Sequence, residues 1–117
     1  MFLWKTYTFQ DVKILIVCTG NSCRSQMAQG WLQSFDKNLN VCSAGTEPAR
    51  EVNPLAINTM KSSGIDISHH TPKSIHEYLN EPWDYVITVC GEANENCPVF
   101  NGKVRQRLHI GFYDPSR

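Results

Sequence analysis

The chain has 117 residues, of which 41% are hydrophobic, and this composition suits one compact domain rather than a disordered chain. Eleven basic residues balance eleven acidic ones, and no basic tail or stripe indicates nucleic acid as a partner. The longest apolar run, at residues 14–18, is far shorter than the ~20 residues of a membrane-spanning helix, and residues 1–10 lack the features of a signal peptide. We expect a cytoplasmic protein that binds neither nucleic acid nor a membrane, and we take it to be a monomer.

Strand-like and helix-like segments alternate along the chain. In chain order we expect an N-terminal extension at residues 1–12, a strand at 13–18, a helix at 25–35, a strand at 40–44, a helix that begins at Pro54 and is closed by Gly64, a short helix at 72–79, a strand at 83–90 and an extended segment at 107–113. Helical spacing predicts that the first helix buries Met27, Ala28, Trp31, Leu32 and Phe35 and that the second uses Leu55, Ala56, Thr59 and Met60.

This alternation is typical of a mostly parallel sheet, in which ligands bind beyond the carboxyl ends of the strands. Cys18, Cys90 and Asp114 fall at or just after predicted strand ends. We therefore expect these three residues to lie at one edge of the sheet.

Five cysteines are unusual in a chain with no predicted export signal. Their number is odd, and the predicted core is large enough to fold without disulfide bonds. In a reducing compartment such cysteines are more often catalytic, redox-active or metal-binding than structural. The composition thus argues against a disulfide scaffold and directs attention to the surroundings of each thiol.

The segment Cys18-Thr-Gly-Asn-Ser-Cys-Arg24-Ser25, between the first strand and the first helix, has the features of a cradle for a tetrahedral oxyanion. Gly20 and Asn21 tolerate left-handed dihedral angles, so the backbone can wrap with its N–H groups turned inward. The start of the helix adds N–H groups and a positive dipole end, and Arg24 adds a planar fork for two oxygens. The same field favours the thiolate of Cys18, which would attack the bound anion. The predicted oxyanion-binding residues are Thr19, Gly20, Asn21, Ser22, Cys23, Arg24 and Ser25. The alternative is a buried cysteine followed by an ordinary turn.

This loop and the residues that follow it, Gln26-Met-Ala28, resemble the low-molecular-weight protein tyrosine phosphatase fold and, within it, the thioredoxin-coupled arsenate reductases. Residues 41–45, 53–56 and 111–115 resemble further segments of the family. The resemblance implies a three-layer α/β fold, with a four-stranded parallel sheet of order 2-1-3-4 flanked by helices. We expect residues 13–117 to form this single domain. Relatives continue into a C-terminal helix after the Asp-Pro loop, and this sequence stops at Arg117, without that helix.

The resemblance also implies how the other thiols act. Cys18 would form a covalent adduct with arsenate, and Cys90 would attack the sulfur of that adduct so that arsenite leaves. Cys97 would then take over the disulfide and present it to thioredoxin, the external reductant. Asp114 would be the general acid that protonates the leaving oxygen. Ser25 would hydrogen-bond the Cys18 thiolate, and Asn21 would hold the shape of the loop.

Two other functions stay open from the sequence. The first is a low-molecular-weight tyrosine or aryl phosphatase, which would need only Cys18, Arg24 and Asp114. The second is a catalytically impaired member of the family that binds oxyanions or senses redox state. Phosphate and sulfate would compete with arsenate for the loop, and no cofactor is expected.

Neither zinc nor potassium is expected to bind. Cys18, Cys23, Cys90 and Cys97, with His69 and His70, are spaced too widely for the usual zinc pairs, and Arg24 would oppose a cation. Some of the reductases that the chain resembles bind potassium beside the loop, and Asn21 and Ser43 match their ligands. Gln29 and Lys73, however, stand where that site has acidic residues. The remaining expectations are that Cys23 packs, that Cys42, Trp31 and Trp83 belong to the core, and that His69 and His70 lie in a solvated loop.

Overall fold

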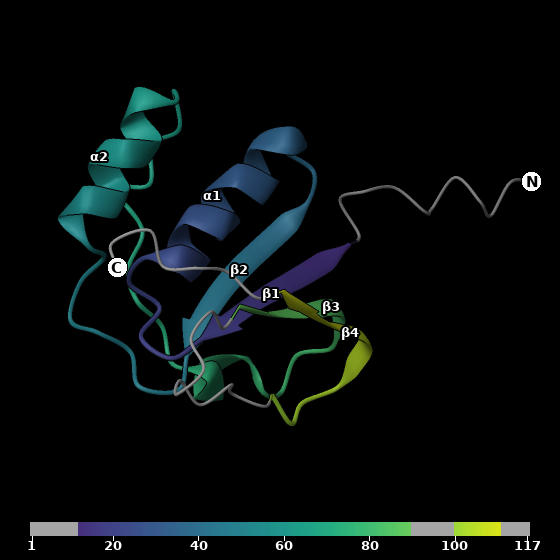
Figure 1. The fold of residues 1–117 in the computed structure, drawn as a ribbon. Helices are drawn as coiled ribbons and strands as arrows, with labels where there is room; N and C mark the ends of the chain where they lie inside the picture. The colour runs from purple at the N-terminus through teal and green to yellow at the C-terminus, as the bar shows by residue number, and fades with distance from the viewer. Residues whose placement is uncertain (1–11, 90–99, 111–117) are drawn as a thin grey trace, which may run out of the picture.

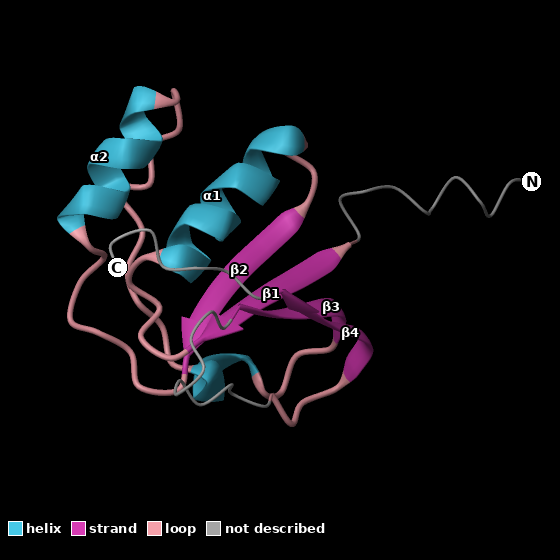
Figure 2. Ribbon diagram, viewed as in Figure 1, coloured by secondary structure: helices cyan, strands magenta, loops and turns pink. Residues whose placement is uncertain are grey.

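The computed structural model describes residues 12–89 and 100–110, which form a parallel sheet with helices on both faces (Figures 1 and 2). The strands are β1 (Lys13–Cys18), β2 (Asn40–Gly45), β3 (Trp83–Val89) and β4 (Val104–Ile110). Their order in the sheet is β2-β1-β3-β4, so the predicted order is confirmed. Since all three pairings are parallel, the carboxyl ends of the strands lie at one edge of the sheet.

The helical segments of the described residues form the outer layers. They are α1 (Arg24–Phe35), α2 (Pro54–Ser62) and the 3-10 helix η3 (Ile75–Tyr78). α1 covers one face of the sheet, where Ala28 and Leu32 pack against a core cluster that includes Ile16. η3 and the chain around Phe100 cover the other face (Figure 2). α2 packs on the outer side of α1, through a cluster that includes Met60. None of the described helices is long and apolar enough to cross a membrane.

Local signals decide where the second helix begins and ends. The Asn53 side chain accepts a hydrogen bond from the Leu55 N–H at 2.8 Å, and Pro54 fills the first helical position. Gly64 follows the helix with a φ of 81°, which a residue without a Cβ adopts at little cost. The predicted bounds of this helix are therefore confirmed. The predicted short helix at 72–79 is a single 3-10 turn capped by Ser74.

Helical spacing was a poor guide to which side chains are buried. Trp31 and Phe35 of α1 are 42% and 74% exposed, so their predicted place in the core is wrong. The close contact of α1 is made by Gly30, where a Cβ atom would lie only 2.8 Å from Ile67 Cγ2 and 3.0 Å from Met60 Cε. The backbone of α1 thus approaches its neighbours at a small residue that carries no hydropathy signal. On α2, Ala56 and Met60 are buried as predicted, whereas Leu55 and Thr59 are exposed.

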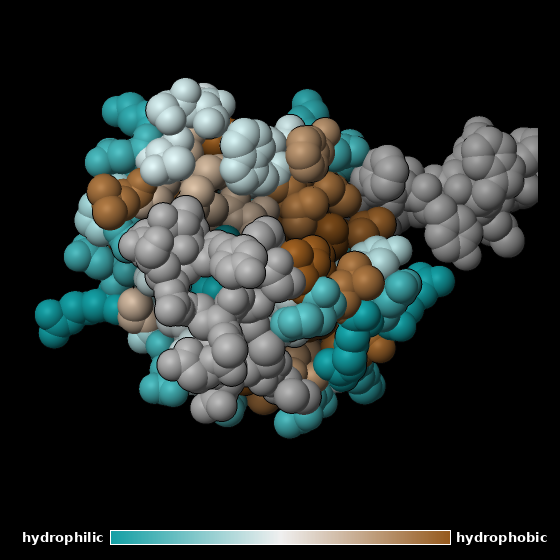
Figure 3. Space-filling model, in the orientation of Figure 1, coloured by the Kyte–Doolittle hydropathy of each residue, from teal (hydrophilic) through white to brown (hydrophobic). Residues whose placement is uncertain are grey.

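The half of the sheet formed by β3 and β4 exposes apolar side chains on the face that carries α1. Tyr85, Leu108 and Ile110 are 37%, 41% and 42% exposed, and Figure 3 shows hydrophobic atoms gathered on this side of the molecule. β4 begins at Val104, three residues before the predicted start, because its alternating charged residues masked the strand pattern. The predicted end of that strand, at residue 113, lies outside the described residues.

Candidate functional site

The predicted oxyanion loop leads from the end of β1 to the start of α1. Cys18 is the last residue of β1 and is buried, and Arg24 is the first residue of α1 and is half-buried. Asn21, at the middle of the loop, is fully buried and has a φ of 53°. Asparagine tolerates this left-handed conformation better than most residues, which agrees with the prediction from the sequence for this position.

The carbonyl groups of this loop are all held from outside by hydrogen bonds. The donors are the N–H groups of Thr46 (to Cys18 O, 3.2 Å), Glu47 (to Thr19 O, 2.9 Å), Ala49 (to Gly20 O, 2.8 Å), Asn53 (to Ser22 O, 2.8 Å) and Met27 (to Cys23 O, 2.9 Å), and the side-chain amide of Gln26 (to Asn21 O, 3.0 Å). In a trans peptide the C=O and N–H bonds point in opposite directions. The N–H groups of residues 19–24 are therefore turned to the concave side of the loop, where they can bind an anion.

The thiol of Cys18 lies on that concave side. Its Sγ atom accepts a hydrogen bond from the Asn21 N–H at 3.1 Å and is 2.9 Å from Ser25 Oγ. The Ser25 oxygen already accepts a hydrogen bond from Asn21 Nδ2 at 2.8 Å, which leaves its own proton to donate to the sulfur. Two hydrogen-bond donors therefore point at the sulfur, which lies beside the N-terminal end of α1.

A buried polar network continues behind Asn21. The Asn21 Nδ2 group also donates to Ser43 Oγ at 2.8 Å, and Ser43 donates to Gln29 Oε1 at 2.5 Å. Asn21 Oδ1 accepts from the Lys73 N–H at 2.8 Å and from Gln26 Nε2 at 3.1 Å. Every polar atom of the Asn21 side chain is therefore bonded, which fixes the residue that shapes the loop.

The strand beside the loop ends at a glycine for a steric reason. A Cβ atom on Gly45 would lie 2.3 Å from the carbonyl oxygen of Thr19 and 3.1 Å from the backbone nitrogen of Asn21. The loop therefore rests directly on the backbone of β2. The sequence shows only that Gly45 ends a strand, not that the loop touches it.

Gln26 and His70 belong to the site, although neither was predicted as a site residue from the sequence. Gln26 is 1% exposed, and its Oε1 atom lies 3.0 Å from His70 Nδ1. Burial, and then the neighbouring His69, lower the pKa of His70, while Asp66 opposes this shift. The expectation of a solvated loop holds for His69, which is exposed, but is wrong for His70, which is half-buried and hydrogen-bonded. The sequence gives no distinctive signal for this pair, because α1 carries three glutamines, Gln26, Gln29 and Gln33.

A cavity of about 180 Å³ lies beside the network. It is lined by Gln29, Cys42, Ser43, His69, His70, Thr71, Lys73 and Tyr78. Burial raises the pKa of the Cys42 thiol and that of Tyr78, the latter to about 12, so both groups are neutral at pH 7. Cys42 is half-buried rather than a full member of the core. The predicted burial of Trp83 is confirmed. Cys23 packs against the cluster between α1 and α2, as expected. Within residues 12–89 and 100–110, no three His, Cys, Asp or Glu side chains are grouped to hold a metal ion.

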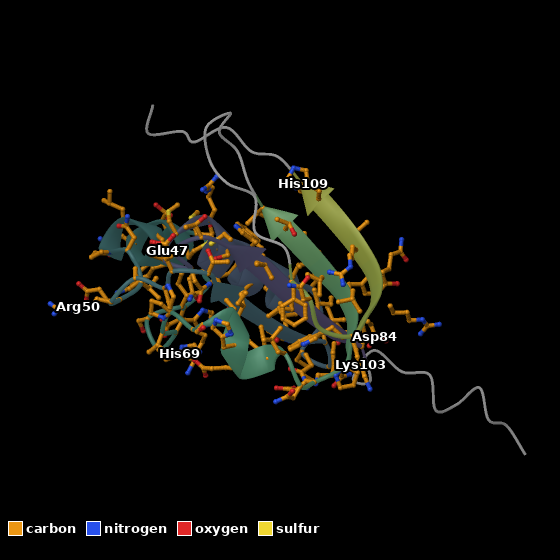
Figure 4. The ribbon with its side chains drawn as sticks, turned by 90° about the horizontal axis from the view of Figure 1, so that it is seen from below. Glu47, Arg50, His69, Asp84, Lys103 and His109 are labelled. Carbon is orange, nitrogen blue, oxygen red and sulfur yellow. The ribbon has the colours of Figure 1, made fainter. Side chains whose placement is uncertain are left out.

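The other predicted catalytic residues, Cys90, Cys97 and Asp114, lie outside the described residues. The strands that precede them end beside the loop: Val17 pairs with Thr88, and Val89 pairs with Ile110. Figure 4 shows Glu47 and His69 at one end of the molecule and Asp84 and Lys103 at the other. The ion pairs of Lys13 with Glu81 and of Arg105 with Asp84 therefore belong to the amino ends of the strands, away from Cys18.

Residues 13–116 match the family described as low molecular weight phosphotyrosine protein phosphatase. The chain belongs to this family. Among similar proteins, arsenate reductase 2 of Staphylococcus saprophyticus is 48% identical over 104 residues, which are 88% of this chain and 78% of that protein.

Solved structures of the family agree with this match. The structure of an arsenate reductase in the phosphate binding state is 35% identical and has a TM-score of 0.75, covering 90% of this chain and 79% of that one. The thioredoxin-dependent arsenate reductase of Corynebacterium glutamicum is 31% identical with a TM-score of 0.65, covering 86% of this chain and 52% of that one. The low-molecular-weight phosphatase fold predicted from the sequence is thus confirmed.

Proposed function

We propose that this protein reduces arsenate to arsenite, with Cys18 as the nucleophile and thioredoxin as the external reductant. The observation that carries the proposal is the loop whose carbonyls are all held outward while Cys18 Sγ faces the N–H groups. Such a site suits a tetrahedral oxyanion attacked at its centre. The 48% identity to an arsenate reductase supports arsenate as the substrate.

The first step is attack of the Cys18 thiolate on the arsenic of bound arsenate. An S–As bond forms, one oxygen leaves as water after protonation, and arsenic stays in its pentavalent state. The inward N–H groups of residues 19–24 and the Arg24 guanidinium would hold the remaining oxygens. Asp114 would supply the proton to the leaving oxygen.

The second step needs a further thiol, a role that we assign to Cys90. Its sulfur attacks Cys18 Sγ, the S–As bond breaks, and its electron pair goes to arsenic, which leaves as trivalent arsenite. Two thiols have then been oxidised to one disulfide. Cys97 attacks Cys90 and frees Cys18, and the dithiol of thioredoxin reduces the resulting Cys90–Cys97 disulfide. The similarity to the thioredoxin-dependent arsenate reductase of Corynebacterium glutamicum supports thioredoxin in this role.

We also propose that the enzyme is a cytoplasmic monomer, with residues 13–117 as its domain and residues 1–12 as an extension. We further propose that it works without potassium. The oxygens that would face a cation beside the loop already accept hydrogen bonds from protein donors. Asn21 Oδ1 accepts from the Lys73 N–H, and Gln29 Oε1 accepts from Ser43. Lys73 also brings a positive charge to this cavity. Potassium chloride and sodium chloride should therefore have equal effects on the rate and on the unfolding midpoint.

The test is arsenite release with thioredoxin, thioredoxin reductase and NADPH, for the parent and for Cys18→Ser, Cys90→Ser and Cys97→Ser. We expect all three variants to lose turnover, while Cys42→Ser, a control at a half-buried thiol outside the loop, keeps it. A single round without thioredoxin should release one arsenite per chain from the parent. Turnover by Cys90→Ser or Cys97→Ser would contradict the relay.

The family match gives the alternative of an aryl phosphatase a specific basis. A phosphatase would hydrolyse para-nitrophenyl phosphate with Cys18, Arg24 and Asp114 and would be indifferent to Cys90→Ser and Cys97→Ser. Phosphate and sulfate are expected to inhibit either activity by filling the loop. Efficient phosphatase activity without arsenate turnover would select the alternative. A folded parent with neither activity that still binds phosphate would select an impaired oxyanion-binding member.

A further inference from the structure

The Cys18 loop has one peptide group whose orientation depends on a side chain. The carbonyl oxygens of Cys18, Thr19, Gly20, Ser22 and Cys23 are held by backbone N–H groups. The carbonyl oxygen of Asn21 is instead held by Gln26 Nε2 at 3.0 Å. The N–H group on the same peptide belongs to Ser22, so the Gln26 amide decides whether this N–H faces a bound anion.

Gln26 also holds the side chain of the same asparagine. Its Nε2 group lies 3.1 Å from Asn21 Oδ1 and 3.2 Å from Thr71 O, so three oxygens surround the amide nitrogen. The orientation of the amide follows, because its oxygen cannot face three acceptors. Oε1 must therefore accept the hydrogen bond from His70 Nδ1 at 3.0 Å.

We propose that Gln26 is a positioning residue that aims the Asn21–Ser22 peptide at the oxyanion, and that His70 fixes the amide of Gln26 by donating from Nδ1. Gln26 acts through Asn21, whose N–H donates to Cys18 Sγ and whose φ is 53°. Without the Gln26 donor, a buried carbonyl loses its partner and the peptide turns toward another donor. The loop would then spend less time in the conformation that binds the anion.

The central experiment compares Gln26→Met with Gln33→Met. Methionine keeps the length of glutamine and removes its hydrogen bonds. Gln33 is a matched control because it also bridges α1 to backbone, with Leu39 O at 2.6 Å and the Val41 N–H at 3.2 Å, at the far end of the helix. Both variants should lower the urea midpoint, and only Gln26→Met should alter the loop.

The deciding measurement is the reactivity of Cys18 in the folded protein, because a residue that only stabilises the fold would leave this reactivity unchanged. Alkylation of Cys18 by iodoacetamide is followed by mass spectrometry, with and without inorganic phosphate or arsenate. For Gln26→Met we expect the rate of alkylation without anion to change and protection by either anion to weaken about tenfold, the loss of one buried hydrogen bond. Gln33→Met should match the parent in both. Equal weakening in the two variants, or protection within twofold of the parent in Gln26→Met, would overturn the proposal.

A second series tests the histidine and covers the case in which Gln26→Met does not fold. His70→Leu removes the donor to Gln26, whereas His70→Asn keeps an N–H near the position of Nδ1. We expect weaker anion protection in His70→Leu, restoration in His70→Asn and no change in His69→Leu, since His69 meets the His70 ring edge-on and the hydrogen bond to Gln26 comes from His70. Loss in His70→Asn equal to that in His70→Leu would remove His70 from the proposal.

The arsenate assay separates this inference from the function on which it rests. If the protein reduces arsenate, Gln26→Met should raise KM more than it lowers kcat, because the loop is less often formed before binding. If the parent fails to reduce arsenate, the alkylation and phosphate-protection measurements still decide the role of Gln26. A parent with turnover and an unaltered Gln26→Met variant would contradict the inference alone.

Discussion

The two halves of the sheet differ in how completely their polar groups are hydrogen-bonded and their apolar side chains are buried. Around β1 and β2, the loop that follows Cys18 has every carbonyl bonded, and the Asn21 side chain makes four hydrogen bonds. Across the sheet, β3 and β4 present Tyr85, Leu108 and Ile110 more than a third exposed on the face beside α1. The first region is fixed by hydrogen bonds and steric contacts, whereas in the second, within residues 12–89 and 100–110, Val89 is buried on this face and these three side chains stay partly open.

This difference separates the described loop, whose N–H groups are held in place, from the exposed face of the two strands that precede Cys90 and Asp114. A loop that must bind an anion in water needs N–H groups held in place before the anion arrives. The hydrogen bonds behind Asn21 and the close backbone contact at Gly45 hold these N–H groups in place. Substitutions in the first region should therefore alter both stability and reactivity, and substitutions at the exposed side chains of the second should alter stability slightly.

The largest effect is expected from Gly45→Ala. A Cβ atom 2.3 Å from the Thr19 carbonyl oxygen must push the loop away from β2. We expect a loss of stability of about 3 kcal/mol from overpacking and a loss of anion-dependent activity of about 100-fold from displacement of the N–H groups. Urea unfolding and arsenate turnover measure the two effects.

The control for this substitution is Gly64→Ala, at a glycine with a φ of 81° and open space around its Cβ position. The left-handed strain should cost about 1 kcal/mol and leave turnover unchanged. Full activity in a folded Gly45→Ala protein would show that the loop does not depend on its contact with β2.

A smaller effect is expected from Ser25→Ala. The Ser25 hydroxyl lies 2.9 Å from Cys18 Sγ and is oriented by Asn21, so its removal takes one donor from the sulfur. We expect alkylation of Cys18 at pH 7 to slow about tenfold, because the sulfur loses one of its two hydrogen-bond donors. Ser34→Ala, which removes an exposed hydroxyl that donates to Trp31 O on the same helix, should leave the rate unchanged.

Prediction from the sequence succeeded where a property is carried by consecutive residues. The apolar run of β1, the Asn53-Pro54 start of α2 and the placement of Cys18 before a helix all follow from neighbouring side chains. It failed where two distant segments touch. Gly30 is buried against Ile67 and Met60, whereas Trp31 is exposed. The helical spacing of apolar residues did not predict this, because it carries no information on how α1 approaches residues 60–67.

The candidate site divides in the same way. The residues expected to bind the oxyanion are contiguous, and the chain brings them together as one loop between β1 and α1. The partners that shape this loop come from residues 43–53 and 70–73, which no local motif connects to it. Cys90, Cys97 and Asp114 remain sequence predictions, since the structure describes residues only up to Val89 and Ile110 on the strands before them.

A modest pH dependence of stability is expected from His70. Burial lowers its pKa from the usual value of 6.5, so the folded protein prefers the neutral ring, and the unfolded chain binds the proton more readily. The stabilisation is fully present above pH 6.5 and is lost as the pH falls through the lower pKa of the folded state. Urea midpoints should fall more steeply below pH 6.5 for the parent than for His70→Asn. Parallel pH profiles for the two proteins would show that His70 does not carry this dependence.

The last prediction compares one leucine from each half of the sheet, and the change at the exposed leucine has the smallest expected effect on stability. Leu15 of β1 is fully buried, and Leu108 of β4 is 41% exposed, so the same change to alanine should have unequal costs. Leu15→Ala should lower stability by about 3 kcal/mol, and Leu108→Ala by about 0.5 kcal/mol, since little surface is removed from the core. Urea unfolding at two protein concentrations measures both. A cost for Leu108→Ala equal to that for Leu15→Ala would mean that this face is covered in solution. A cost that grows with protein concentration would assign the cover to a second copy of the chain, and a cost independent of concentration would assign it to another part of the same chain.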